Sequence, residues 1–170
     1  MLRSALVIVV LGVFPALAGA QVRGPFEVLV SANGENGNKF NGFSAGGTGS
    51  FGYFFNDNIE LAVRDSVNYS DIGGVSLNNT VRLAADFHIP LGDQNQFLPY
   101  GGANIGYVSG KDVRDTWEAA PEIGLKVFVG ADAFVDIQAE YQFFFRTGGQ
   151  TVNAFKNGEF VYTLGVGFRF

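Results

Sequence analysis

The sequence contains no cysteine, a single histidine and a single tryptophan among its 170 residues. Without cysteine, the chain forms no disulfide bonds and offers no thiolate to a metal or a substrate. One histidine leaves carboxylates as the remaining metal ligands, and their spacing does not match a calcium-binding loop. The sequence therefore predicts no metal and no cofactor, and the fold must be stabilised by burial and backbone pairing.

Long hydrophobic runs are also scarce, and the one at the N-terminus is short. It extends from Ala5 to Phe14, follows the positive charge of Arg3 and falls well below the roughly 20 residues that a membrane-spanning helix needs. Small residues follow it up to Ala20, in the pattern of a secretory cleavage site. We therefore predict a signal peptide over residues 1–20, cleaved between Ala20 and Gln21.

Basic residues are few in the exported chain. Removal of the signal peptide leaves one domain of residues 21–170, with 10 Lys and Arg against 16 Asp and Glu, so its net charge is −6. A mildly acidic surface gives no reason to expect nucleic acid as a partner.

The residues that are abundant are glycine and phenylalanine, with 24 and 18 copies, while proline has only 5. After residue 20 the apolar residues recur with a period of two, which is typical of β-strands, and no segment has a helical period. Eight alternating segments result: 24–34, 40–54, 58–69, 77–89, 98–108, 121–129, 133–145 and 159–170.

The connections between these segments alternate in length. Residues 55–58, 90–96 and 130–132 are short turns rich in Gly, Asn, Asp and Pro, as β-hairpins require. The longer and more polar connections are 33–40, 68–76, 108–117 and 146–158. This alternation predicts an all-β fold, an eight-stranded antiparallel up-and-down barrel.

The polar face of the strands indicates which side of the barrel faces inward. It carries glycines and charges of both signs, a composition that suits the narrow lumen of an eight-stranded barrel better than a water-facing sheet. From this face, which also carries Glu27, we predict a lumen ionic network of nine side chains: Glu60, Arg64, Arg82, Asp86, Glu122, Lys126, Asp136, Glu140 and Arg169. The apolar face would then contact lipid.

Aromatic residues collect near the predicted strand ends, as in the interfacial girdles of membrane proteins. They are Phe51, Tyr53, Phe54, Phe87, Phe97, Phe143, Phe145, Phe160, Phe168 and Phe170. In lipid every backbone group must be paired, so the last strand is expected to close the barrel against the first, around Phe26–Ser31.

Several motifs resemble the small OmpA/OmpX-type, opacity-protein-like outer-membrane β-barrel family. They are the signal peptide, the hairpin "GYFFNDNIEL", the strand "PYGGANIGY" and the terminal "GVGFRF". The resemblance implies a bacterial outer-membrane location, with the short turns periplasmic and four longer loops outside the cell. It also implies that Phe168 and Phe170 form a signal for the barrel-assembly machinery.

The same resemblance implies the partners. They are membrane lipids and lipopolysaccharide, the outer-membrane assembly machinery and a possible surface ligand of the loops, and we expect the barrel to be a monomer.

Asp65 does not fit the pattern, because it falls on the lipid-facing side of its strand between Val63 and Val67. Either it lies near the outer interface, or a β-bulge shifts the register there.

The single histidine, His88, is the one candidate for catalysis, with Asp86 two residues away on the same face. No serine lies nearby in the sequence on the same face. We therefore expect a rim or lumen histidine bonded to a carboxylate, and no catalytic residue.

The leading functional hypothesis is a structural or surface-interaction barrel with a plugged lumen. The alternatives are a narrow porin-like channel for ions or small solutes, a lipid A-modifying enzyme, and a soluble ligand-binding barrel.

Overall fold

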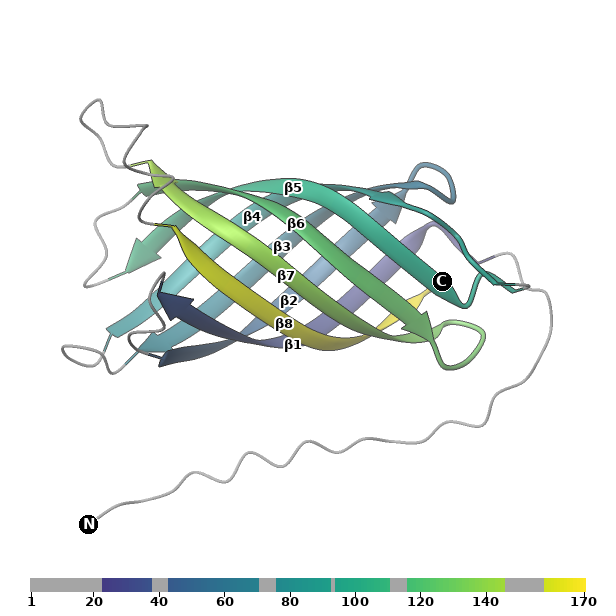
Figure 1. Ribbon diagram of the computed structural model, residues 1–170, viewed down its shortest axis with the longest axis horizontal. Coiled ribbons are helices and arrows are strands. Elements are labelled where there is room, and N and C mark those ends of the chain that lie inside the picture. The colour runs from purple at the N-terminus through teal and green to yellow at the C-terminus, as the bar shows by residue number, and fades with distance from the viewer. Residues whose placement is uncertain (1–22, 38–42, 71–75, 93, 111–115, 146–157) are drawn as a thin grey trace, which may run out of the picture.

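The computed structural model describes residues 23–37, 43–70, 76–92, 94–110, 116–145 and 158–170. They form eight strands, as predicted (Figure 1). The strands are β1 (Phe26–Gly37), β2 (Phe43–Phe54), β3 (Ile59–Ser70), β4 (Ser76–His88), β5 (Phe97–Gly110), β6 (Thr116–Phe128), β7 (Ala133–Phe145) and β8 (Glu159–Arg169). Among the described residues, no helix is long and apolar enough to cross a membrane.

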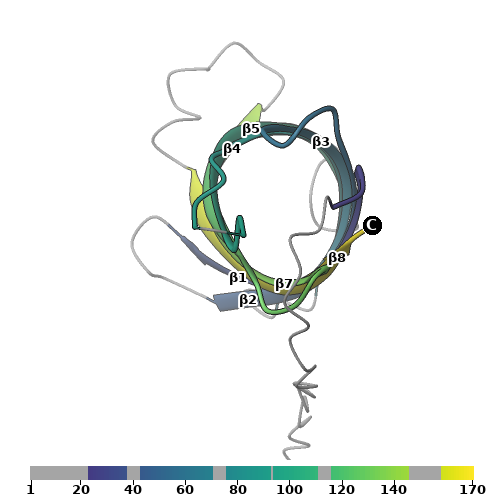
Figure 2. The ribbon, with the colours of Figure 1, turned by 90° about the vertical axis from the view of Figure 1, so that its right-hand side faces the viewer.

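The sheet is a closed antiparallel barrel, which confirms the predicted fold class. Each strand pairs with its neighbour in the sequence, and β8 pairs with β1 (Figure 2). The turns β2–β3, β4–β5 and β6–β7 lie at the same end as Phe170, and we call this the short-turn end. The opposite end is called the loop end.

The register determines the shape of the barrel. A row of paired residues that starts on β5 returns to β5 ten residues further along that strand. The row is Phe97, Val127, Val135, Val166, Val30, Gly49, Asp65, Val81 and Tyr107. Eight strands staggered in this way tilt by roughly 40° and enclose an interior just wide enough to be filled by side chains.

The outer wall of the barrel is apolar. Tyrosine hydroxyls aside, the described side chains that point outward from the strands are apolar or small, with three exceptions: Asp65, Asn79 and Ser109. The wall exposes a continuous set of large apolar side chains, including Val30, Leu83 and Ile123, and Ile123 is 67% exposed. A surface of this kind is stable in lipid and would aggregate in water.

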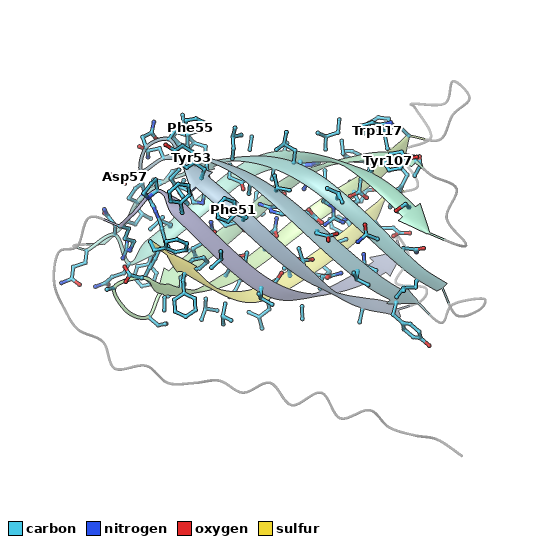
Figure 3. All side chains as sticks on the ribbon, turned by 180° about the vertical axis from the view of Figure 1, so that it is seen from behind. Phe51, Tyr53, Phe55, Asp57, Tyr107 and Trp117 are labelled. Carbon is cyan, nitrogen blue, oxygen red and sulfur yellow. The ribbon has the colours of Figure 1, made fainter. Side chains whose placement is uncertain are left out.

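Aromatic side chains mark both ends of this wall, in agreement with the predicted girdles (Figure 3). Tyr53 and Phe55 lie at the short-turn end, with ring centroids 5.1 Å apart. Tyr107 and Trp117 lie at the loop end, 5.5 Å apart and edge to face. For Phe54 the predicted place in a girdle was wrong, because its side chain points into the lumen and is 3% exposed.

Three of the four long connections were predicted too long. β1 continues to Gly37, β3 to Ser70 and β5 to Gly110, because backbone pairing at the loop end continues through polar and glycine residues. β6 begins at Thr116, five residues before the predicted start, although Pro121 lies within it. Pro121 lacks an N–H group, and the pairing of β6 with β7 is interrupted beside it.

The barrel closes at the last residue. The backbone N–H of Phe170 donates to the carbonyl of Phe26 over 2.8 Å, and the N–H of Phe26 donates to the carbonyl of Phe170 over 3.0 Å. The two rings lie 6.3 Å apart on the outer wall. The sequence-based expectation that the last strand pairs with the first is confirmed.

Asp65 faces outward without a bulge. Its pairs with Gly49 and Val81 belong to uninterrupted ladders, so the register does not shift there. Asn79 Nδ2 donates to Asp65 Oδ1 over 2.7 Å. Along β3, Asp65 lies four residues from Tyr69 of the loop-end girdle, so the carboxylate sits in the loop-end half of the wall.

Candidate functional site: the charged lumen

The nine side chains predicted for the ionic network all point into the lumen. None is more than 8% exposed. They come from five of the eight strands, because inward-facing positions recur at every second residue and the closed sheet brings distant strands around one axis.

Arg64 of β3 is the centre of the network. Its Nη2 lies 2.8 Å from Asp86 Oδ2 and 2.8 Å from Glu122 Oε1, and its Nη1 donates to Glu122 Oε2 over 2.8 Å. The guanidinium therefore joins β4 to β6 across the lumen. This fork geometry suits arginine better than lysine, since two carboxylates are bound at once.

Asn104 of β5 extends the central cluster. Its Nδ2 donates to Glu122 Oε2 over 2.5 Å and to Glu140 Oε2 over 2.7 Å. Gln142 Nε2 donates to Glu140 Oε1 over 2.7 Å. Neutral amides thus connect two carboxylates that would otherwise repel each other.

Arg82 of β4 holds a second cluster nearer the loop end. Its Nε is bonded to Glu118 Oε1, and its Nη1 lies 3.5 Å from Glu140 Oε1 and donates to Ser66 Oγ over 3.2 Å. Beyond Ser66 the hydrogen bonds join uncharged hydroxyl and amide groups. Ser66 Oγ lies 2.8 Å from Thr48 Oγ1, which donates to Asn33 Oδ1 over 3.3 Å.

Lys126 of β6 holds a third cluster, nearer the short-turn end. Its Nζ donates to Glu27 Oε1 over 2.6 Å and to Glu60 Oε2 over 2.7 Å. Rings of Phe54 and Tyr100 face the ammonium at 5.2 Å and 5.5 Å, within the range of cation–π attraction.

Asp136 of β7 is paired with Lys126 in the β6–β7 ladder, but its carboxylate is hydrogen-bonded to a different residue. It accepts a hydrogen bond from the hydroxyl of Tyr100 over 3.1 Å. The side chain of Asp136 is fully buried.

Two members of these clusters were missed by the predicted network, Glu27 and Glu118. Glu27 was placed on the polar face, but nothing in the sequence pairs it with Lys126, which is 99 residues away. Glu118 falls next to a predicted connection, and only the earlier start of β6 places it on a strand. Its alternation with Trp117 and Ala119 was the signal that would have revealed it.

An apolar layer lies beside the third cluster. It consists of Leu29, Leu98, Phe128 and Phe134, and each is less than 9% exposed. The Phe128 and Phe134 rings are 5.2 Å apart, on either side of the β6–β7 turn. This layer was not predicted, because no local pattern joins inward-facing residues of β1, β5, β6 and β7 into one cluster.

Two arginines close the barrel at the short-turn end. Arg169 lies 3.6 Å over the ring of Phe54, and its Nη2 lies 3.5 Å from the exposed Asp57 Oδ1. Arg23 lies 3.5 Å over the ring of Phe128 and donates from Nε to the Ala131 carbonyl over 3.0 Å. Arg169 therefore belongs to the rim, and its described ion pair is with a turn residue outside the three lumen clusters.

His88 is fully buried between the rings of Phe54 and Tyr100, each 5.0 Å away. Its Nε2 lies 3.4 Å from Glu60 Oε2, so the nearest carboxylate comes from the neighbouring strand β3 and not from Asp86. Among the described residues no serine hydroxyl is bonded to His88, and no group of His, Asp and Glu has the arrangement of a metal site.

The predicted assembly residues lie on the outer wall, where Phe168 and Phe170 are 45% and 58% exposed. The predicted cleavage site, Ala20 and Gln21, lies outside the described residues.

Comparison with known proteins shows similarity in structure only. No protein-family model and no curated protein matches the chain. Among solved structures, the N-terminal β-barrel domain of Pseudomonas aeruginosa OprF is 24% identical, with a TM-score of 0.57, 85% of this chain and 97% of that chain covered. Neisserial surface protein A is 14% identical, with a TM-score of 0.63 and coverage of 88% and 100%.

An outer-membrane enzyme is also among the similar structures. PagL is 15% identical, with a TM-score of 0.52, and the match covers 82% of this chain and 97% of that chain. Since the same architecture occurs in a surface protein and an enzyme, the similarity defines the fold and not the activity. The chain therefore has the fold of the small eight-stranded outer-membrane β-barrels.

Proposed function

We propose that the protein is an integral outer-membrane barrel with a structural or surface-interaction role and a lumen that is plugged. The observation that carries this proposal is the series of buried side chains across the lumen. Arg82, Arg64 and Lys126 each join carboxylates from different strands, and the apolar layer around Phe128 and Phe134 follows them.

The apolar outer wall supports the membrane location, and the predicted signal peptide of residues 1–20 supplies export. We place the short-turn end in the periplasm and the loop end outside the cell. Cell fractionation tests the location, because the protein should be found in the outer-membrane fraction. It should also migrate differently on a gel before and after boiling, and a soluble protein without such a shift would contradict the proposal.

The proposed partners are membrane lipids and lipopolysaccharide around the wall, and the assembly machinery at Phe168 and Phe170. Both phenylalanines are exposed at the end of β8, where another protein can reach them. A surface ligand of the outer loops remains part of the proposal, and we expect the barrel to be a monomer.

A narrow channel for ions or small solutes is the second candidate. It is favoured by the arrangement around Arg82, whose guanidinium is bonded to Glu118 and lies within 3.5 Å of Glu140. An arginine between two carboxylates can exchange partners and open a path. Steady single-channel currents from the purified barrel would support this candidate over the plugged lumen.

We do not propose an enzyme, although the similar barrel PagL is one. His88 is shielded by aromatic rings at the short-turn end, where it does not face lipid. Replacement of His88 by alanine should leave the lipid A of expressing cells unchanged. A change in lipid A that depends on His88 would overturn this conclusion.

A further inference from the structure

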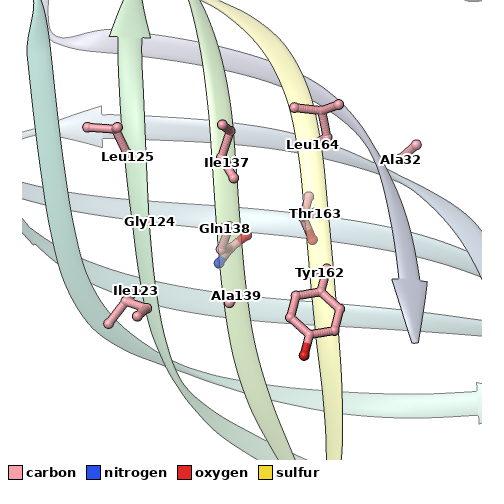
Figure 4. A pocket seen from close by; sticks show the side chains of 10 residues that line it. All are labelled: Ala32, Ile123, Gly124, Leu125, Ile137, Gln138, Ala139, Tyr162, Thr163 and Leu164. Carbon is pink, nitrogen blue, oxygen red and sulfur yellow. The ribbon is translucent and has the colours of Figure 1, made fainter. Parts of the chain in front are cut away.

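Buried polar atoms without a hydrogen-bond partner in the described part of the chain belong to side chains that face the lumen. The outer wall has a different character. Where it is hollowed over β6, β7 and β8, it presents apolar side chains such as Ile123, Ile137 and Leu164 (Figure 4). One of the atoms without a partner is Oδ1 of Asp86, in the central cluster of the lumen.

Each of the three lumen clusters contains one cation and two carboxylates. The sets are Arg64 with Asp86 and Glu122, Arg82 with Glu118 and Glu140, and Lys126 with Glu27 and Glu60. With all acids ionised, each cluster would have a net charge of −1. An uncompensated charge is costly in a buried site, and a proton on one acid of a cluster removes it.

In the central cluster, hydrogen bonds stabilise the ionised form of Glu122. Its Oε2 accepts from Arg64 Nη1 over 2.8 Å and from Asn104 Nδ2 over 2.5 Å, and its Oε1 lies 2.8 Å from Arg64 Nη2. A carboxylate that accepts several N–H hydrogen bonds keeps its charge. Glu122 is therefore the charged acid of this pair.

Asp86 is placed less favourably for a charge. Its Oδ2 accepts from Arg64 Nη2 over 2.8 Å, whereas its Oδ1 packs against the backbone of Gly102, where a Cβ would collide with it. Glu60 lies directly across the β3–β4 ladder, and Glu122 contacts the same arginine nitrogen. Like charges at this distance favour the protonated form of a carboxyl group.

One cation contacts Asp86 among the described residues, and it is Arg64. Arg82 is on the same strand as Asp86, but it is bonded to Glu118. The charged and titratable side chains that surround Asp86 are Glu60 and Arg64 of β3, Arg82 and His88 of β4, Tyr100 of β5 and Glu122 of β6.

We propose that Asp86 holds a proton at neutral pH and donates it in a hydrogen bond to Glu122, which makes the central cluster of the plug sensitive to pH. The two carboxyl groups lie within hydrogen-bonding reach of each other. With this proton the cluster is neutral, and its loss at alkaline pH leaves two carboxylates on one guanidinium. The inference rests on the proposed plugged lumen, to which it adds a site of regulation.

Infrared spectroscopy of the barrel in phospholipid vesicles tests the proposal, because a protonated carboxyl group has its own C=O stretching band. With isotope-labelled aspartate, the wild-type band at neutral pH should shift. Asp86→Asn should lack the band and still fold, because its amide can also donate to Glu122. Asp136→Asn is the matched control and should retain the band, since Asp136 accepts a hydrogen bond from Tyr100 as a carboxylate.

A second variant, Glu122→Gln, should lose the band although Asp86 is present, because Asp86 then forms an ion pair with Arg64 alone. Raising the pH should remove the wild-type band reversibly and lower the urea midpoint of unfolding. A proton bound in the folded barrel alone contributes stability that is lost on its release, so Asp86→Asn should lack this part of the decline.

Three infrared results would overturn the proposal: no band in the wild type, a band that shifts with labelled glutamate instead of aspartate, or a band that persists in Asp86→Asn or Glu122→Gln. Equal pH dependence of the midpoint in wild type and Asp86→Asn would also overturn it. Failure of the proposed plug is a separate result, because it would appear as steady wild-type currents at neutral pH.

Discussion

At the scale of single residues, Arg64 holds the central cluster of the lumen. Its replacement by alanine leaves Asp86 and Glu122 buried without their cation, and removal of one partner from a buried ion pair costs about 3–5 kcal/mol. We expect the free energy of unfolding to fall by that amount in urea titrations of the reconstituted barrel. Trp117, the single tryptophan, is the fluorescence reporter.

The matched control for Arg64 removes the charges together. A triple variant with Arg64→Met, Asp86→Asn and Glu122→Gln retains similar volumes and leaves no unpaired charge. It should recover most of the lost stability. If Arg64→Ala alone is as stable as wild type, the central ion cluster does not exist as described.

Asp65 gives a second prediction at this scale, based on its partner in the wall. Asp65→Val should leave the free energy of unfolding unchanged or raise it by about 1 kcal/mol, because it removes an acid from the apolar wall together with the hydrogen bond from Asn79. Val63→Asp places an acid on the same face beside the apolar Phe51 and Leu83, and it should lower the free energy of unfolding by about 2 kcal/mol. Equal effects of the two changes in unfolding titrations would contradict this difference.

Some residue-level features were not predictable from the sequence. Phe54 and Phe134 are apolar residues on the inward parity, and the sequence alone does not distinguish a lumen plug from a girdle. The pairing of Glu27 with Lys126 depends on how far the strands are staggered around the barrel, which no local pattern encodes.

At the scale of elements, the β1–β8 seam depends on the final residue. Deletion of Phe170 removes both backbone hydrogen bonds to Phe26 and the contact between their rings. An unpaired edge is costly in lipid, so we expect the heat-modifiable fraction in the outer membrane to fall severalfold. Phe170→Tyr keeps these interactions and should assemble normally, while full assembly of the deletion variant would count against the seam.

The strands themselves were the most predictable elements. Alternation defined all eight, and the Gly- and Asn-rich turns defined three hairpins, because both signals are local. The ends of the strands toward the loops were less predictable. Ser109 and Gly110 of β5, for example, pair there with Asn79 and Asn78, so this end of the strand lacks the apolar alternation.

At the scale of the whole molecule, the described lumen contains more acids than bases. Seven carboxylates face four cationic side chains: Glu27, Glu60, Asp86, Glu118, Glu122, Asp136 and Glu140, against Arg64, Arg82, Lys126 and Arg169. Amide and hydroxyl groups, including Asn104 and Tyr100, bond to several of these oxygens. The outer wall is apolar, whereas the lumen is charged, and this contrast suits the chain to a membrane.

The measurement that tests the central claim most directly is the conductance of the purified barrel in a planar lipid bilayer. Three ionic clusters and the apolar layer of Phe128 and Phe134 occupy the lumen, so the wild-type protein should be electrically silent. Steady wild-type currents that change in Arg82→Ala would contradict the plugged lumen and establish a channel.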